Sequence, residues 1–153
     1  KVRQIRRKNL RDSKKQLMKY LILLLIPFYS FTQANVPDKY WINDTDFENK
    51  IAQVSSFGDN NFETIVIEFW AEFNKDNCFT DWNKIKNAKY YRVDISKAPK
   101  AKKKYRIRMA PTLIIFKNGE KQMIFKAGLD LLLPTDLAEI QQAINEVNTA
   151  SSF

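Results

Sequence analysis

The segment TIVIEFW, residues Thr64 to Trp70, constrains the fold more than any other part of the sequence. It is a nearly continuous run of apolar and β-branched residues with polar segments on both sides. A half-exposed strand alternates apolar and polar residues, whereas an unbroken apolar run of this length is typical of a strand with both faces covered. We therefore expect a central sheet that lies between layers of helices.

The segments around this strand alternate between strand patterns and helix patterns. A helix to Ser55, capped by Asn43, Asp44 or Thr45, precedes it, and a short basic helix begins at Pro99. Further strands are predicted at residues 40–42, 90–95, 112–116 and 121–126, and further helices at residues 76–87 and 134–147. This (β)αβαβαββα order predicts an α/β protein with a central mixed sheet of four to five strands, flanked by helices, with a closing β-hairpin at Asn118-Gly119 and a C-terminal helix.

Residues 1–34 have a composition of their own. Residues 1–19 carry nine Lys or Arg and one Asp, and residues 20–31, YLILLLIPFYSF, are almost wholly apolar. A basic region, a short apolar run and a small residue, here Ala34, describe a secretory signal peptide. The apolar run is shorter than the ~20 residues that span a bilayer, and Pro27 interrupts it. An uncleaved signal anchor and a buried core segment are the alternatives.

We therefore divide the chain into residues 1–34, a basic segment plus signal peptide or signal anchor, and residues 35–153, a globular domain. This division predicts a protein that is exported, periplasmic or membrane-anchored and that faces outside the cytoplasm. Contact with the membrane is expected only through residues 20–31, and only if that segment is not cleaved. No nucleic-acid partner is expected, because the net charge of +9 is concentrated in residues 1–19 and the rest of the chain is nearly neutral.

A second basic cluster lies inside the domain, between two predicted strands. Its members are Lys97, Lys100, Lys102, Lys103, Lys104, Arg106 and Arg108. Such a cluster can attract an acidic partner, but a solvated face of a basic helix explains it as well. Without exposed aromatic residues between the cations, it is weak support for nucleic-acid binding.

The chain has one cysteine, Cys78, and no histidine. An intramolecular disulfide is therefore impossible, and no Cys/His cluster can hold zinc. Ser–His–Asp and Cys–His catalysis are excluded because both need an imidazole. We expect no metal site and no cofactor.

Two stretches carry a resemblance to a known family. Residues 66–73, VIEFWAEF, lead into a polar corner, and residues 90–121, YYRVDISKAPKAKKKYRIRMAPTLIIFKNGEK, contain Ala110-Pro111-Thr112. With these motifs, the sequence from Asp44 to Val147 resembles the thioredoxin family. The resemblance implies a thioredoxin-like fold, a cis peptide bond before Pro111 opposite the active-site corner, and a substrate peptide that pairs with the backbone of Ala110.

The redox motif that this resemblance implies is degenerate. Thioredoxins carry C-x-x-C at the corner, whereas aligning from FWAEF without a gap places Asn74 and Asn77 at the two thiol positions. Cys78 then lies one residue too far along. A one-residue insertion places Cys78 at the second thiol position and Lys75 at the first. Because neither alignment gives a dithiol, we expect no dithiol oxidoreductase activity, and Cys78 is the only candidate thiol.

Two single residues at this corner allow more than one interpretation. Cys78 is either a small buried hydrophobic residue, a redox-active thiol that forms mixed disulfides or a sulfenic acid, or a link between two chains. Glu68 occupies the position of the family's buried acid, which moves a proton to the second thiol. Since the thiols are gone, we expect instead a partly buried Glu68 that pairs with Lys117 or Lys121.

The residues around the corner predict a binding site. Asn74, Asp76 and Asn77 are expected to cap the helix that follows, or to form a polar recognition surface that faces Pro111. Five aromatic residues are expected in the core rather than in a ligand cage: Trp70, Phe73, Trp82, Tyr90 and Tyr91. We expect a non-catalytic module that holds an extended peptide or partner protein in a groove lined by Phe73, Asn74, Lys75, Asp76, Asn77, Ala110 and Pro111. A single-cysteine protein of redox homeostasis or disulfide handling, using Cys78, is the alternative.

Overall fold

The computed structural model describes residues 36–52 and 63–150. The predictions for the basic segment, the apolar run at 20–31 and the boundary at residue 34 lie outside the described residues. So does the end of the first predicted helix, residues 53–55. Within the described ranges, no helix is long enough and apolar enough to cross a membrane.

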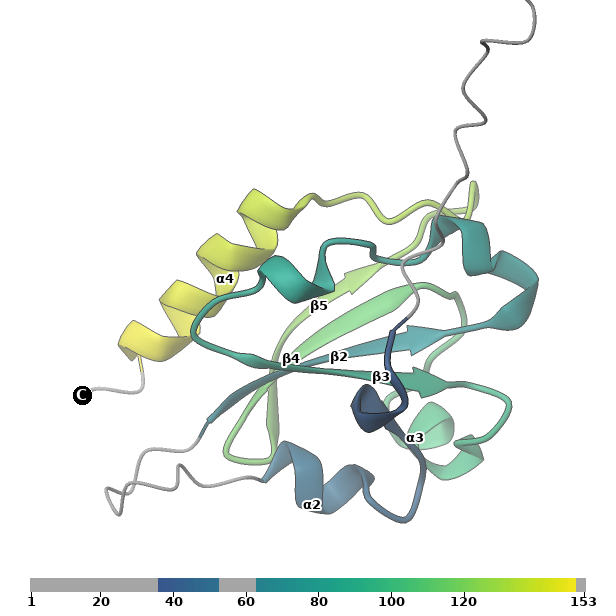
Figure 1. Cartoon of the computed structure of the whole chain (residues 1–153), viewed down its shortest axis with the longest axis horizontal. Helices are drawn as coiled ribbons and strands as arrows, with labels where there is room; N and C mark the ends of the chain where they lie inside the picture. Colours follow the sequence, from purple (N-terminus) through teal and green to yellow (C-terminus); the bar gives the residue numbers. More distant parts are fainter. Residues whose placement is uncertain (1–35, 53–62, 151–153) are drawn as a thin grey trace, which may run out of the picture. The chain divides into compact units, whose positions relative to one another are not determined.

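Within the described residues, the domain is built on one mixed sheet of five strands in the order β1-β3-β2-β4-β5. Figure 1 labels the strands β2 to β5 of this sheet. The strands are β1 (Trp41–Ile42), β2 (Thr64–Trp70), β3 (Lys89–Asp94), β4 (Thr112–Lys117) and β5 (Glu120–Lys126). β3 is parallel to both β1 and β2, whereas β4 is antiparallel to β2 and β5 is antiparallel to β4. Asn118 and Gly119 join the last two strands with φ angles of 52° and 74°, as a two-residue hairpin turn requires. The predicted mixed sheet and closing hairpin are confirmed.

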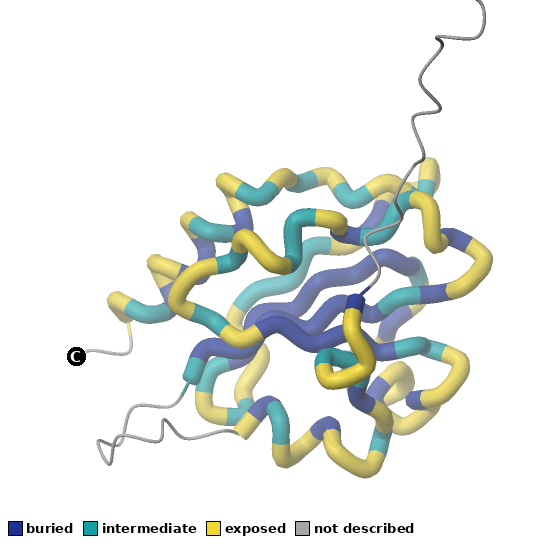
Figure 2. Tube along the Cα trace, viewed as in Figure 1, coloured by how far each residue is buried: buried dark blue, intermediate teal, exposed yellow. Residues whose placement is uncertain are grey.

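The central strand β2 is buried on both faces, as its unbroken apolar run predicts (Figure 2). Ile65, Ile67 and Phe69 pack on one face of the sheet with Phe47 of the helix α2 (Phe47–Ile51). Val66 packs on the opposite face with Ile140 and its neighbours in the C-terminal helix α4 (Leu137–Ala150). In the described parts of the chain, the core therefore consists of two apolar clusters with the sheet between them.

Two helix starts differ in detail from the prediction. α2 begins at Phe47, so the predicted capping residues lie in the turn before it. The Asp44 carboxylate instead accepts hydrogen bonds from the backbone N–H groups of Lys100 and Ala101, at 2.9 and 2.8 Å. It thereby caps α3 (Pro99–Lys104), which begins at Pro99 as expected. α4 begins three residues after Pro134 and runs to Ala150.

The predicted helix over residues 76–87 is wrong. The chain forms two short 3₁₀ segments there, η2 (Glu72–Asn77) and η3 (Trp82–Lys84), and Cys78 between them has extended backbone angles. The backbone N–H of Phe79 donates to Glu68, and its carbonyl accepts from Arg92. Because buried side chains bind both groups, neither can join a helical ladder, and this explains why the amphipathic pattern does not form a helix.

Candidate functional site

The corner predicted to carry function forms where β2 ends and β4 begins. The two strands are antiparallel, and Phe69 pairs with Thr112, so the chain leaving β2 lies next to the chain entering β4. η2 follows the end of β2, and Ala110 and Pro111 precede β4, with a cis peptide bond between them. The structure therefore brings together the two segments that the resemblance pairs.

Asn74 ties this corner together through its side-chain amide. Its Nδ2 donates to the carbonyl of Ala110 at 2.7 Å and to the carbonyl of Leu131 at 2.8 Å. Its Oδ1 accepts from Nδ2 of Asn77 at 2.7 Å. Asn74 is buried, with 8% of the residue exposed. Asn74 therefore does not cap a helix, as one interpretation expected, because it binds backbone carbonyls of two distant loops.

These hydrogen bonds change what the corner can offer to a peptide. The resemblance implies that the backbone of Ala110 pairs with a bound strand. Here the Ala110 carbonyl already accepts a hydrogen bond from the chain's own Asn74. A carbonyl has a second lone pair, but a peptide that approaches along the same direction must first displace the amide. Side-chain contacts around the corner therefore matter more than strand pairing on this carbonyl.

Three large apolar side chains are exposed around the Asn74 corner. Phe73, Leu129 and Leu132 are 72%, 98% and 51% exposed. Phe73 precedes Asn74, and Leu132 follows the residue whose carbonyl Asn74 binds, so this hydrogen bond holds the two segments next to each other. We name Phe73, Leu129 and Leu132 the apolar rim. Placing Phe73 in the core was therefore wrong.

The loop that carries Leu129 and Leu132 is folded tightly onto itself. The N–H of Gly128 donates to the carbonyl of Leu132 at 3.1 Å, and the N–H of Leu131 donates to the carbonyl of Gly128 at 3.0 Å. Leu131 has a φ of 61°, which is unfavourable for a residue with a Cβ. The hydrogen bond from Asn74 stabilises the Leu131 carbonyl in this conformation, so the corner and the loop depend on each other.

The other predicted groove residues lie at the surface of η2. Lys75 forms an exposed ion pair with Glu72, with 3.2 Å between Nζ and Oε1. Asp76 is exposed, and Asn77 is half-buried. An exposed ion pair of this kind contributes little to stability. Lys75 and Asp76 therefore lie on the outer face of the corner, whereas Asn77 reaches inward to Asn74.

Glu68 lies at the centre of a second polar cluster, inside the domain. Its Oε1 accepts from the N–H of Phe79 at 2.9 Å. Its Oε2 accepts from Nε and Nη2 of Arg92 at 3.0 and 2.8 Å, and from the hydroxyl of Tyr90. Glu68 is fully buried, and Arg92 is 3% exposed. We name Glu68, Tyr90 and Arg92, with the backbone of Phe79, the buried ionic cluster.

The partner predicted for Glu68 was wrong, and the sheet register explains why. Arg92 is the residue directly opposite Glu68 on β3. Lys117 pairs instead with Thr64, at the other end of β2, and Lys121 pairs with Phe116 on β4. The signal was present in the sequence, since Arg92 is the charged residue in the interior of its strand, whereas Lys89 and Asp94 lie at the two ends. Glu68 is likewise the only charged residue of β2, and opposite charges in the interiors of adjacent strands favour pairing.

Cys78 lies next to this buried ionic cluster and is half-buried. Burial raises the pKa of its thiol, and the negative charge of Glu68 raises it further, against an opposing contribution from Arg92. A reactive cysteine needs a lowered pKa and an accessible sulfur. The environment of Cys78 therefore disfavours the thiolate that a redox function requires.

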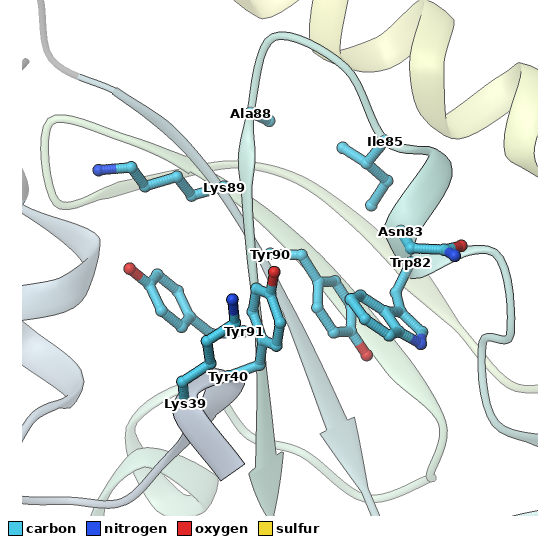
Figure 3. A pocket seen from close by; sticks show the side chains of 9 residues that line it. All are labelled: Lys39, Tyr40, Trp82, Asn83, Ile85, Ala88, Lys89, Tyr90 and Tyr91. Carbon is cyan, nitrogen blue, oxygen red and sulfur yellow. The ribbon is translucent and has the colours of Figure 1, made fainter. Parts of the chain in front are cut away.

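A pocket of ≈ 540 Å³ lies beside the first residues of β3 (Figure 3). Tyr40, Trp82 and Tyr90 line it and pack on one another, with ring centroids 4.9 Å apart for Tyr40–Trp82 and 5.9 Å for Trp82–Tyr90. The Tyr90 hydroxyl donates to Glu68, and Lys89 pairs with Glu63. These two polar groups are therefore already engaged, and four of the nine residues that line the pocket are aromatic.

Within residues 36–52 and 63–150, no group of three or more His, Cys, Asp or Glu side chains is placed to hold a metal ion.

Beyond Arg92, the sequence interpretation also missed Leu129, Leu131 and Leu132. Nothing in their residue types indicates a loop that folds back on the corner, because an apolar run at this position is also typical of a core segment.

Comparisons with known proteins agree with this geometry. The family model described as thioredoxin matches residues 39–133, more than half of the chain. A search among curated proteins finds no match. The thioredoxin of Schistosoma mansoni superposes with a TM-score of 0.53 at 22% identity, over 74% of this chain and 96% of its own. The thioredoxin of Plasmodium falciparum gives 0.52 at 18%, over 69% and 96%, and that of Malassezia sympodialis 0.52 at 22%, over 69% and 89%. The chain therefore belongs to the thioredoxin family. Because it has a single cysteine, it lacks the family's dithiol.

Proposed function

We propose that this protein is a non-catalytic binding module that holds an extended peptide or partner protein at the Asn74 corner. The observation that carries the proposal is that Asn74 and Asn77, which the ungapped alignment places at the two thiol positions, are amides that bind to protein groups. Asn74 and Asn77 hydrogen-bond to each other, and Asn74 also binds the Ala110 and Leu131 carbonyls. These hydrogen bonds give the corner a fixed shape, and neither amide is a nucleophile.

The apolar rim supports a binding role. Phe73, Leu129 and Leu132 are the large hydrophobic residues that are exposed among the described residues. Single exposed apolar residues are common on soluble proteins, but three of them on two segments joined at one corner form a patch. Aromatic anchors such as Phe73 are enriched at the centres of protein interfaces. The partner would therefore contribute apolar side chains that pack between Phe73 and the leucines.

The location of the protein belongs to the same proposal. The basic and apolar composition of residues 1–31 supports export or anchoring at a membrane, with the domain facing outside the cytoplasm. A binding role in that setting needs no electron supply and no cofactor. The partner is a protein or an extended peptide that the exported domain meets there.

The absence of catalysis is tested by a reduction assay with insulin disulfides. We expect no turnover by the full chain, because thiol–disulfide exchange by the family needs two thiols. A dithiol thioredoxin from another source serves as the positive control. Turnover at a rate comparable to that control would overturn the proposal.

The binding role is tested by selection from a phage-displayed library of random peptides. We expect the full chain to enrich peptides with a shared apolar pattern. The double variant F73S/L129S should lose this enrichment. L137S, which changes a half-buried leucine at the start of α4, is the matched control. Enrichment that is equal with F73S/L129S would show that the apolar rim does not bind the peptides.

A further inference from the structure

Three cations surround a small pocket beside the proline corner. The pocket has a volume of ≈ 280 Å³ and is lined by Arg106, Ile107, Arg108, Met109, Thr112 and Lys126. Ile107 and Thr112 are buried and form the inner wall, whereas the three basic residues are exposed. No acidic residue is among the residues that line it. We name Arg106, Arg108 and Lys126 the cationic triad.

The fold places these cations around one point. The backbone N–H groups of Arg106 and Ile107 bond to the carbonyls of Lys103 and Lys102, and Arg106 has a φ of 53°. This turn ends α3 and buries Ile107, so the side chains of Arg106 and Arg108 stay outside. Lys126 lies opposite Thr112 in the β4–β5 register and is the third cation that lines the pocket.

The cationic triad has no acidic partner within the described parts of the chain. Six other cations there form ion pairs, namely Lys75, Lys84, Lys89, Arg92, Lys97 and Lys104. Arg106, Arg108 and Lys126 form none. Three neighbouring cations repel one another, and Lys100, Lys102 and Lys103 on the exposed side of α3 strengthen the positive potential. A bound anion would relieve this repulsion.

We infer that the pocket lined by the cationic triad binds an acidic segment of a partner protein, with Asp or Glu carboxylates between Arg106, Arg108 and Lys126. Arginine presents a planar fork of donors that matches a carboxylate. A pocket of 280 Å³ with an apolar inner wall fits one or two side chains of a peptide. The lining residues include no aromatic side chain on which a nucleobase could stack, and this favours a peptide over nucleic acid.

The pocket lies next to the Asn74 corner, so one partner can contact both. Thr112, which lines the pocket, directly follows Pro111. Ala127, which directly follows Lys126, donates its N–H to the Pro111 carbonyl at 3.0 Å. Leu129 follows three residues after Lys126. Binding of an acidic segment does not require the apolar rim, however, because the cationic triad attracts it on its own.

The test measures, by fluorescence anisotropy, how tightly the full chain binds a fluorescein-labelled peptide. The peptide has twelve residues, of which two are Leu and the others are Glu. The matched peptide has Gln in place of every Glu. We compare the wild type with R106Q/R108Q/K126Q and with the control K39Q/K86Q/K121Q, which removes the same charge from exposed lysines elsewhere. Residues 1–35, with their own basic side chains, are identical in all three proteins.

We expect the acidic peptide to bind the wild type more tightly than the Gln peptide, with a difference that shrinks as salt is added. Loss of three exposed charge contacts at the pocket should weaken binding by about tenfold, whereas the control variant should change it by about twofold or less. Equal weakening in both variants would overturn the inference, because it would mean that only the general charge attracts the peptide. Tighter binding of a single-stranded oligonucleotide of equal charge, or of anionic lipid vesicles, would overturn it as well.

A second measurement follows the wild-type protein and therefore does not depend on the folding of the pocket variants. Backbone amide shifts of the wild type, followed during addition of the acidic peptide, should move at residues 106–109, 112 and 126. Movement confined to residues 1–35 would contradict the inference. A peptide that shifts the triad in both the wild type and F73S/L129S supports the cationic pocket even if the proposed role of the apolar rim fails.

Discussion

Two polar clusters flank the end of β2, and they differ in nearly every physical respect. The Asn74 corner uses neutral amides to join three loops at the surface. The buried ionic cluster uses charged side chains to hold the backbone of Phe79 inside the domain. In a dithiol thioredoxin the corresponding region is one catalytic unit. Here the two clusters have separate structural roles, so we expect changes in the inner one to alter stability more than changes in the outer one.

The largest effect is expected from breaking the inner cluster. R92L removes the two hydrogen bonds from Arg92 to Glu68 and the one to the Phe79 carbonyl. It leaves the Glu68 carboxylate buried without its countercharge. Loss of one partner of a buried ion pair costs about 3–5 kcal/mol of unfolding free energy. Urea denaturation of the full chain measures this cost.

The double variant E68L/R92L sharpens this test. With both charges replaced by apolar side chains, no uncompensated charge is left, and much of the stability should return. The Phe79 N–H and carbonyl would then be free to join a helix, so far-UV circular dichroism should show more helix than the wild type. An unchanged spectrum would contradict our explanation of why residues 76–87 do not form a helix.

The outer cluster should give a smaller effect on stability. N74A leaves the buried Ala110 carbonyl without its donor and frees the Leu131 loop, which costs about 1–3 kcal/mol of unfolding free energy. The exposed K75A is the matched control, because its ion pair with Glu72 contributes little. A loss for N74A as large as that for R92L would contradict the proposed difference between the clusters.

The sequence predicted the sheet, the hairpin and the proline corner because each has a strong local signal: a run of β-branched residues, an Asn-Gly turn, and Ala-Pro-Thr in the family's spacing. It did not predict the fate of residues 76–87. Phe79, Trp82 and Ile85 have helical spacing, but Glu68 and Arg92 capture the backbone of Phe79 from distant strands. Tertiary hydrogen bonds of this kind override a local pattern, and they become visible only when the register of β2 and β3 is known.

The pH dependence of stability separates the inner cluster from the outer one. Burial raises the pKa of Tyr90 well above its usual range, with a further increase from the charge of Glu68, and burial also raises the pKa of Cys78. Both groups are neutral when protonated, so the folded state binds their protons more tightly than the unfolded state. Their contribution to stability is complete below the unfolded pKa values and is lost as the pH rises above them.

We therefore expect the free energy of unfolding to be steady around neutral pH and to decrease above pH ~9, where the unfolded thiol and then the unfolded phenol ionise. Y90F should flatten the upper part of this decrease, although it removes a hydrogen bond at all pH values. N74A should not alter the slope, because Asn74 does not titrate. Denaturation curves at a series of pH values measure this dependence. If the unfolding free energy of Y90F fell with pH as steeply as that of the wild type, the assignment to Tyr90 would be wrong.

The smallest effect on stability is expected at Cys78, the residue that first indicates redox chemistry. C78S should change the unfolding free energy by about 1 kcal/mol or less, since the thiol is half-buried and serine keeps a group that can hydrogen-bond with Arg92. Native protein at neutral pH should react slowly with iodoacetamide, because burial raises the thiol pKa, and denatured protein should react fast. R92L should alter the native rate, because Arg92 is the charge that lowers this pKa. Rapid alkylation of the native wild type would instead favour a reactive thiol, and with it a single-cysteine redox function.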